Sequence, residues 1–146
     1  MIEPAQASID TAAIYAARNQ NVRWDDPMLE LREGQHAGEF IVSEGNGTIS
    51  RETITALSGE TLEAGAALGK VTASGKYKAL DPVAVDGSEV AAAILYDAVG
   101  ASAAEAVAIL RLAEVHAEDL VWPHGIAAGE KTTALGELAV LTIIAY

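Results

Sequence analysis

The feature that most limits the fold of this chain is a repeated pattern of short strand-like runs separated by glycine turns. After the first 47 residues, residues 48–56 are β-branched and alternate polar with apolar positions. Residues 68–73 and 77–80 flank the turn Ser74-Gly75-Lys76, an arrangement typical of a β-hairpin. The dipeptide Asp86-Gly87 marks a further turn. The pattern predicts a mainly β domain.

The second half of the chain adds small helices to this β pattern. Residues 90–99 form an apolar run that predicts a strand buried on both faces. Residues 104–115 fit a helical face and a buried strand equally well, so the period alone leaves both open. Residues 127–138 have helix-forming composition, and residues 140–146 predict a closing strand. The expected fold class is therefore mainly β with small helices (α+β).

The first 47 residues have a different character and end in the turn-rich string 43–47. We therefore predict an extended N-terminal arm over residues 1–47, with a short helix at 9–17, and a domain over 48–146. The arm lacks clear periodicity but carries large apolar side chains at Trp24, Met28, Leu29, Leu31 and Phe40. Either these side chains fold back onto their own subunit, or they anchor the arm to a neighbouring protein as it orders on binding. We favour the anchoring role.

Charge and composition exclude several kinds of partner. The chain has 21 acidic and 9 basic side chains, a formal net charge of −12, which repels phosphate backbones and anionic lipid headgroups. Nucleic acid and membrane are therefore not expected partners. The chain has no cysteine, which excludes disulfides, thiolate metal sites and cysteine nucleophiles. The N-terminus lacks a signal-peptide pattern and the apolar stretch 138–146 is too short to span a bilayer, so we expect a soluble protein made in the cytoplasm.

No catalytic, cofactor-binding or metal-binding residues are predicted. His36, His116 and His124 lack the helical spacing with a partnering acid that metallohydrolases use. The acidic pairs at 25–26 and 118–119 are typical of a solvated face in so acidic a chain. The serines lie in or near turns and none sits in a Gly-x-Ser-x-Gly elbow. We expect no enzyme activity and no cofactor.

An ordered series of short motifs resembles the lambda-type head decoration protein family over roughly two thirds of the chain, from about residue 48 onward. The series comprises Leu62-Glu63-Ala64-Gly65, Leu68-Gly69-Lys70, Gly75-Lys76-Tyr77, Leu80-Asp81-Pro82, Asp86-Gly87-Ser88, residues 93–98, residues 113–115 and Leu120-Val121-Trp122-Pro123. No single motif is decisive, but their order and spacing together are fairly specific.

The resemblance implies a compact β-clip-like subunit that forms homotrimers at three-fold and quasi-three-fold positions on the outer surface of a phage head. It implies contacts with the major capsid protein through the N-terminal arm, and a role in stabilising the shell against packaged DNA. It also favours a strand over residues 104–115. Trp122 and Pro123 are candidate interface residues, although a core position for Trp122 is equally compatible with the sequence.

Two other functions deserve comparison. A trimeric β-clip nucleotide hydrolase of the deoxyuridine triphosphatase type would need a nucleotide-binding acid and phosphate-contacting cations, and the β domain offers few basic side chains. Before the C-terminal helical region they are Arg51, Lys70, Lys76, Lys78 and Arg111. A biotinyl or lipoyl carrier domain would need a modified lysine in a tight hairpin within its own motif, which is absent.

Overall fold

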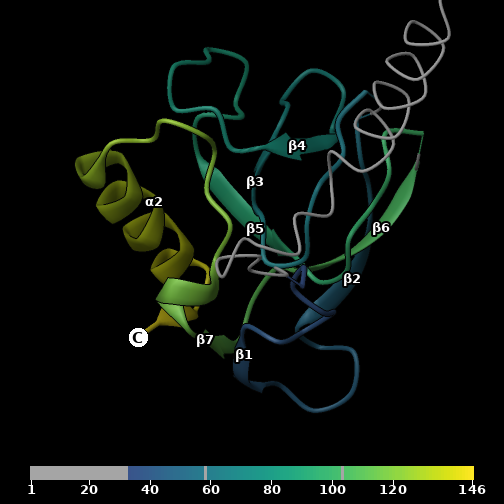
Figure 1. The fold of residues 1–146 in the computed structure, drawn as a ribbon, viewed down its shortest axis with the longest axis vertical. Coiled ribbons are helices and arrows are strands. Elements are labelled where there is room, and N and C mark those ends of the chain that lie inside the picture. Colours follow the sequence, from purple (N-terminus) through teal and green to yellow (C-terminus); the bar gives the residue numbers. More distant parts are fainter. Residues whose placement is uncertain (1–32, 58, 103) are drawn as a thin grey trace, which may run out of the picture. The chain divides into compact units, whose positions relative to one another are not determined.

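The computed structural model describes residues 33–57, 59–102 and 104–146. Gly34–Tyr146 form one compact unit. Its described part is mainly β, with two sheets and one α-helix, which confirms the predicted fold class. Figure 1 shows the arrangement of the strands and of the helix beside them.

The larger sheet has five antiparallel strands in the order β2-β6-β5-β3-β4. Their bounds are Arg51–Thr55 (β2), Ala67–Lys70 (β3), Tyr77–Ala79 (β4), Ala91–Leu95 (β5) and Glu105–Ile109 (β6). The predicted hairpin is confirmed, because β3 pairs with β4 from Leu68 opposite Ala79 to Lys70 opposite Tyr77. The predicted strand at 90–99 is confirmed as β5, which is almost wholly buried.

The smaller sheet has three strands in the order β1-β7-β8, namely Ile41–Glu44 (β1), Ala113–Val115 (β7) and Ile143–Ala145 (β8). β1 runs antiparallel and β8 parallel to β7. The crossover from β7 to β8 contains the short 3₁₀ helix η1 (Ala117–Asp119) and helix α2 (Ala128–Val140). The predicted C-terminal helix and closing strand are thus both confirmed.

Residues 104–115 form two strands in two different sheets. β6 ends at Ile109 in the larger sheet, and β7 begins at Ala113 in the smaller one. Between them Leu112 has a φ of 51°, a left-handed conformation at the bend that leads from one sheet to the other. The strand assignment is confirmed, and the turn at Leu112 divides the run in two.

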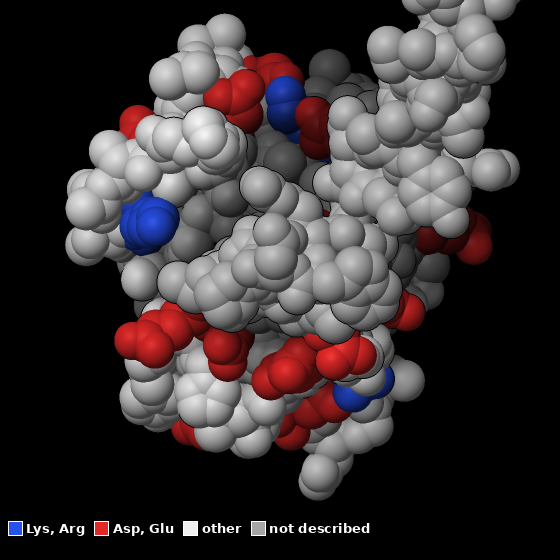
Figure 2. All heavy atoms as spheres, in the orientation of Figure 1, with Lys and Arg blue, Asp and Glu red and all other residues white. Residues whose placement is uncertain are grey.

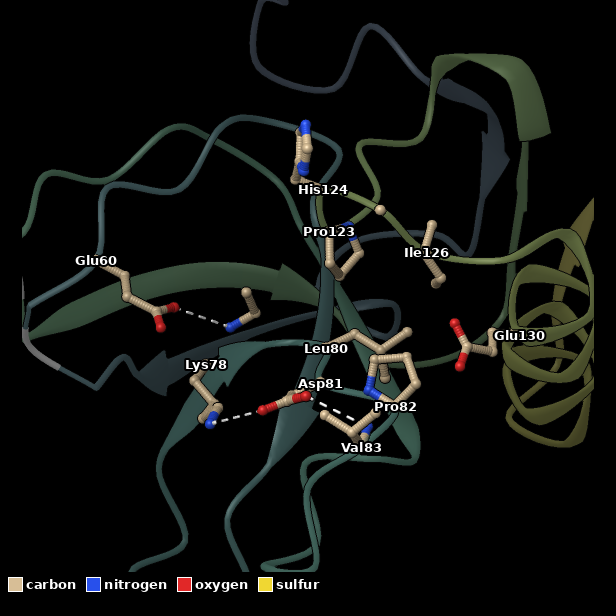
Figure 3. Close-up of a pocket in the computed structure, with 12 residues that line it drawn as sticks. Glu60, Lys78, Leu80, Asp81, Pro82, Val83, Pro123, His124, Ile126 and Glu130 are labelled. Atoms are coloured by element: carbon tan, nitrogen blue, oxygen red, sulfur yellow. Dashed lines mark hydrogen bonds and ion pairs between the residues drawn. The ribbon is translucent and has the colours of Figure 1, made fainter.

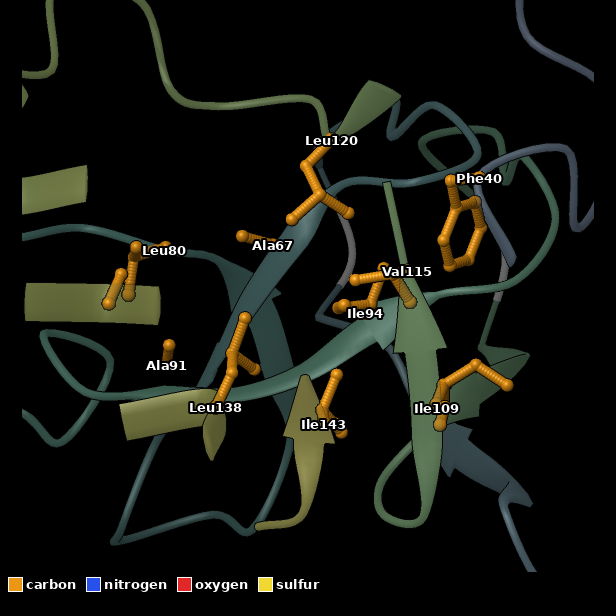
Figure 4. Packing of buried hydrophobic residues seen from close by; sticks show 12 residues of the cluster. Phe40, Ala67, Leu80, Ala91, Ile94, Ile109, Val115, Leu120, Leu138 and Ile143 are labelled. Carbon is orange, nitrogen blue, oxygen red and sulfur yellow. The ribbon is translucent and has the colours of Figure 1, made fainter. Parts of the chain in front are cut away.

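The domain begins earlier than the sequence pattern indicates. Phe40, which we assigned to the arm, is 0% exposed and lies in the hydrophobic core of the unit (Figure 4). Its carbonyl accepts a hydrogen bond from the His116 amide at 2.9 Å. The turn after β1 is also internal, because the Ser50 hydroxyl accepts from the Gly45 amide and donates to the Leu112 carbonyl. Residues 34–47 are therefore part of the β unit, and the turn string is a connection within it.

Helix α2 completes the core on one side of the larger sheet. It lies beside β5 and β8, and it buries Ala134 and Leu138 (Figures 1 and 4). Its first turn is fixed by the Glu130 carboxylate, which accepts a hydrogen bond from the Ala127 amide at 2.9 Å. The alanine-rich composition permits this close packing of small side chains between larger ones such as Leu138 and Phe40.

Candidate interaction surface

The loop between β4 and β5, residues 80–90, is held in one shape by local hydrogen bonds. The Asp86 carboxylate accepts from the Ser88 hydroxyl at 2.5 Å and from the Ser88 amide at 3.0 Å. These bonds, the hydroxyl first, hold the pKa of Asp86 below its ordinary value. The Lys78 ammonium group lies 3.8 Å from the Asp81 carboxylate and 3.9 Å from the Asp86 carboxylate, so it forms ion pairs with both ends of the turn.

This ordered loop presents apolar side chains to solvent. Val83 is 83% exposed and Val85 is 97% exposed. Single exposed apolar residues are common, whereas these two lie two positions apart on one hydrogen-bonded loop, which makes the loop a candidate contact surface. Neither valine is among the interface residues predicted from the sequence. Residues 82–85 are apolar and lie between two turn signals, which indicates a loop that carries apolar side chains. A local pattern does not specify, however, whether those side chains are exposed.

A hollow of about 360 Å³ lies between this loop and the segment that leads into α2 (Figure 3). Leu80, Pro82 and Val83 line one side, while Pro123 and Glu130 line the other. The predicted interface residue Pro123 is therefore at a surface depression. Its neighbour Trp122 is half-buried and packs against the core cluster, so its indole contributes to both core and surface.

The other predicted interface residues are distributed differently. Phe40 is a core residue of the unit, as described above. Trp24, Met28, Leu29 and Leu31 lie outside the described residues. The structure thus places Trp122 and Pro123 near one another and separates Phe40 from the surface.

The charge of the described surface is mostly negative. Figure 2 shows acidic side chains in several places on one face and basic side chains in few. Among the described residues, no group of three or more His, Cys, Asp or Glu side chains is placed to hold a metal ion. None of the described helices combines the length and apolar character that crossing a bilayer requires.

Comparison with known families identifies the chain. The family model for the bacteriophage lambda head decoration protein D matches residues 30–143. The chain belongs to this head decoration family. The match starts close to Gly34, where the compact unit begins, and continues through β1 and Phe40 to β8. No individual curated protein matches significantly.

Membership in the head decoration family gives the chain its broad function. It is a phage head decoration protein, associated with the capsid. The geometry is compatible with a protein that acts by contact, because its distinctive surface features are exposed valines, a proline-lined hollow and unbalanced negative charge.

Proposed function

We propose that this protein is a non-enzymatic cement protein that binds the outer surface of the phage head as trimers. In this proposal the trimers sit at three-fold and quasi-three-fold positions and stabilise the shell against packaged DNA. The observation that carries the proposal is the family match, which spans nearly the whole compact unit.

The exposed apolar side chains support a role in association. Val42, Ile49, Val83, Val85 and Val140 are all exposed large hydrophobic residues. Covering such residues in contacts with other subunits removes apolar area from water, which favours binding by about 25 cal/mol per Å² before the entropic costs of association. A cement protein stabilises a shell because it binds the assembled lattice and not the opened one.

We further propose that residues 1–33 form the capsid-contacting arm. The apolar residues Trp24, Met28, Leu29 and Leu31 belong to this segment, and Phe40 no longer does, since it is needed in the core. Large apolar side chains in a segment that orders on binding provide anchors and offset the entropy lost on ordering. The major capsid protein is the proposed partner of these anchors.

The test uses empty expanded heads of the parent phage assembled without this protein. Cryo-electron microscopy of heads mixed with the purified chain should show added density at three-fold positions, and native mass spectrometry should show a trimer or a monomer that trimerises on the head. Heads without added density would reject the decoration role, and a stable dimer in solution would reject the trimer.

A further inference from the structure

Three hollows with volumes of about 360, 250 and 450 Å³ lie in a row beside helix α2. The first two share Leu80, Pro82 and Glu130, and the second and third share Val90 and Glu137. Hollows that share lining residues are adjacent, and we refer to this row of three hollows, which lie largely between α2 and the segment from β4 to β5, as the groove.

Apolar side chains line part of every hollow and dominate in the hollow at the C-terminal end of α2. Leu80, Ala91 and Ala134 are buried residues that line it. Toward the C-terminal end of α2, Val90 and Val140 are exposed, with Val140 83% accessible to solvent. A partly sheltered apolar groove of this kind suits a peptide segment whose apolar side chains enter it.

Carboxylates along the groove are oriented by the backbone but lack cationic partners. Glu60, Glu89, Glu130 and Glu137 accept hydrogen bonds from the amides of Ala79, Gly87, Ala127 and Ala91, respectively. Within the part of the chain that the structure describes, none of the four forms an ion pair with lysine or arginine.

Two basic side chains, Lys78 and Arg111, also line the groove, and both already pair with carboxylates. Lys78 pairs with Asp81 and Asp86, and Arg111 pairs with Glu52 at 2.6 Å. The groove therefore combines apolar lining residues with four glutamates that have no cationic partner among the described residues. A segment that contains both apolar and basic side chains complements it.

Charge also decides between possible occupants. A second copy of this chain carries a net charge of −12 and has only 9 basic side chains, so it would bring like charge to the groove. We propose that the groove along α2 docks a segment of the major capsid protein in which lysine or arginine alternates with apolar residues. This inference rests on the proposed decoration function and identifies the surface that contacts the major capsid protein.

The test compares lysine substitutions at two consecutive positions of α2 that face in different directions. Thr133 lines the groove, whereas Thr132 does not, and both are exposed on α2 with hydroxyls bonded at 3.0 Å to the carbonyl four residues earlier. Thr133→Lys and Thr132→Lys therefore have the same chemistry and the same net charge. They differ in whether the new ammonium group enters the groove.

Binding is measured by co-sedimentation with the same undecorated heads over a range of salt concentrations. We expect Thr133→Lys to weaken binding by about tenfold, the effect of roughly 1.4 kcal/mol. Thr132→Lys should bind within twofold of the unmodified chain. Circular dichroism melting checks that both variants fold alike.

A second pair of variants removes charge without removing hydrogen-bond acceptors. The double change Glu89→Gln with Glu137→Gln should flatten the salt dependence of binding. The control, Glu105→Gln with Glu118→Gln, makes the same change in net charge at exposed positions outside the groove and should leave the salt dependence unchanged. If Thr133→Lys melts well below Thr132→Lys, its binding no longer reports on the groove alone, and the glutamine variants then provide the test.

The outcomes separate the inference from the function on which it rests. If the unmodified chain fails to bind heads, the decoration function is rejected and the groove assignment with it. If it binds and the groove variants match their controls, only the groove assignment is rejected. Loss of the trimer in native mass spectrometry of Thr133→Lys would identify the groove as a contact between copies and overturn the assignment to the coat.

Discussion

Replacing Phe40 tests where the folded unit begins. Phe40 is fully buried and belongs to the cluster that contains Ile109, Val115 and Leu138. Truncating a buried phenylalanine to alanine costs about 3–5 kcal/mol, because the surrounding core cannot fully close the cavity. At about 4 °C per kcal/mol for a domain of this size, Phe40→Ala should melt roughly 12–20 °C below the unmodified chain.

Two deletions extend the same test to the whole segment 34–47. This segment supplies Phe40 and strand β1, and it takes part in backbone hydrogen bonds with Tyr96, Leu112 and His116. Each such bond contributes about 0.5–1.5 kcal/mol, so the three add about 1.5–4.5 kcal/mol to the contribution of Phe40. The combined loss approaches the total stability of a typical domain, about 5–15 kcal/mol.

The assay is thermal unfolding followed by circular dichroism. A chain that lacks residues 1–33 should melt cooperatively near the full-length protein, whereas one that lacks residues 1–47 should be unfolded or melt far lower. Val42→Ala is the matched control within β1, because Val42 is exposed and should change stability by less than about 0.5 kcal/mol. Equal melting temperatures for the two deletions would refute the assignment of residues 34–47 to the folded unit.

Three further predictions follow from single contacts. Trp122→Ala should lower either the melting temperature or capsid occupancy, because the indole packs on the core beside the surface hollow; wild-type values of both in melting and co-sedimentation experiments would contradict this role. Gly69→Ala should destabilise the domain by about 1–3 kcal/mol in denaturant titration, since the added Cβ would lie 2.2 Å from the Ser88 carbonyl oxygen, and an unchanged midpoint would show that the loop yields easily. For Asp86, whose pKa is lowered mainly by the Ser88 hydroxyl, the stabilising contribution is present above the ordinary pKa of 3.8 and is lost as the pH falls through the lowered folded value. Carboxyl NMR titration should show Ser88→Ala raising the pKa of Asp86, and an unmoved pKa would exclude the hydroxyl as its main cause.

The sequence by itself determined the features that depend on local pattern. The hairpin at 68–80 follows from two short strands around a turn with Gly75, whose φ is 70°. The helix and the closing strand follow from composition over neighbouring residues, as α2 and β8 confirm. The net charge of −12 likewise follows from composition alone, and it constrains which partners are attracted to the surface.

Only the tertiary structure decided which distant segments meet. β1 pairs with β7, so Phe40 joins the core through contacts with residues far along the chain, while the adjacent string 43–47 resembles an ordinary linker. Residues 104–115 divide between two sheets because the chain turns at Leu112. The groove along α2 likewise combines Leu80 and Val90 of the loop between β4 and β5 with Glu137 of α2. Burial, exposure and charge compensation are properties of such long-range packing, and a local pattern of residues does not specify them.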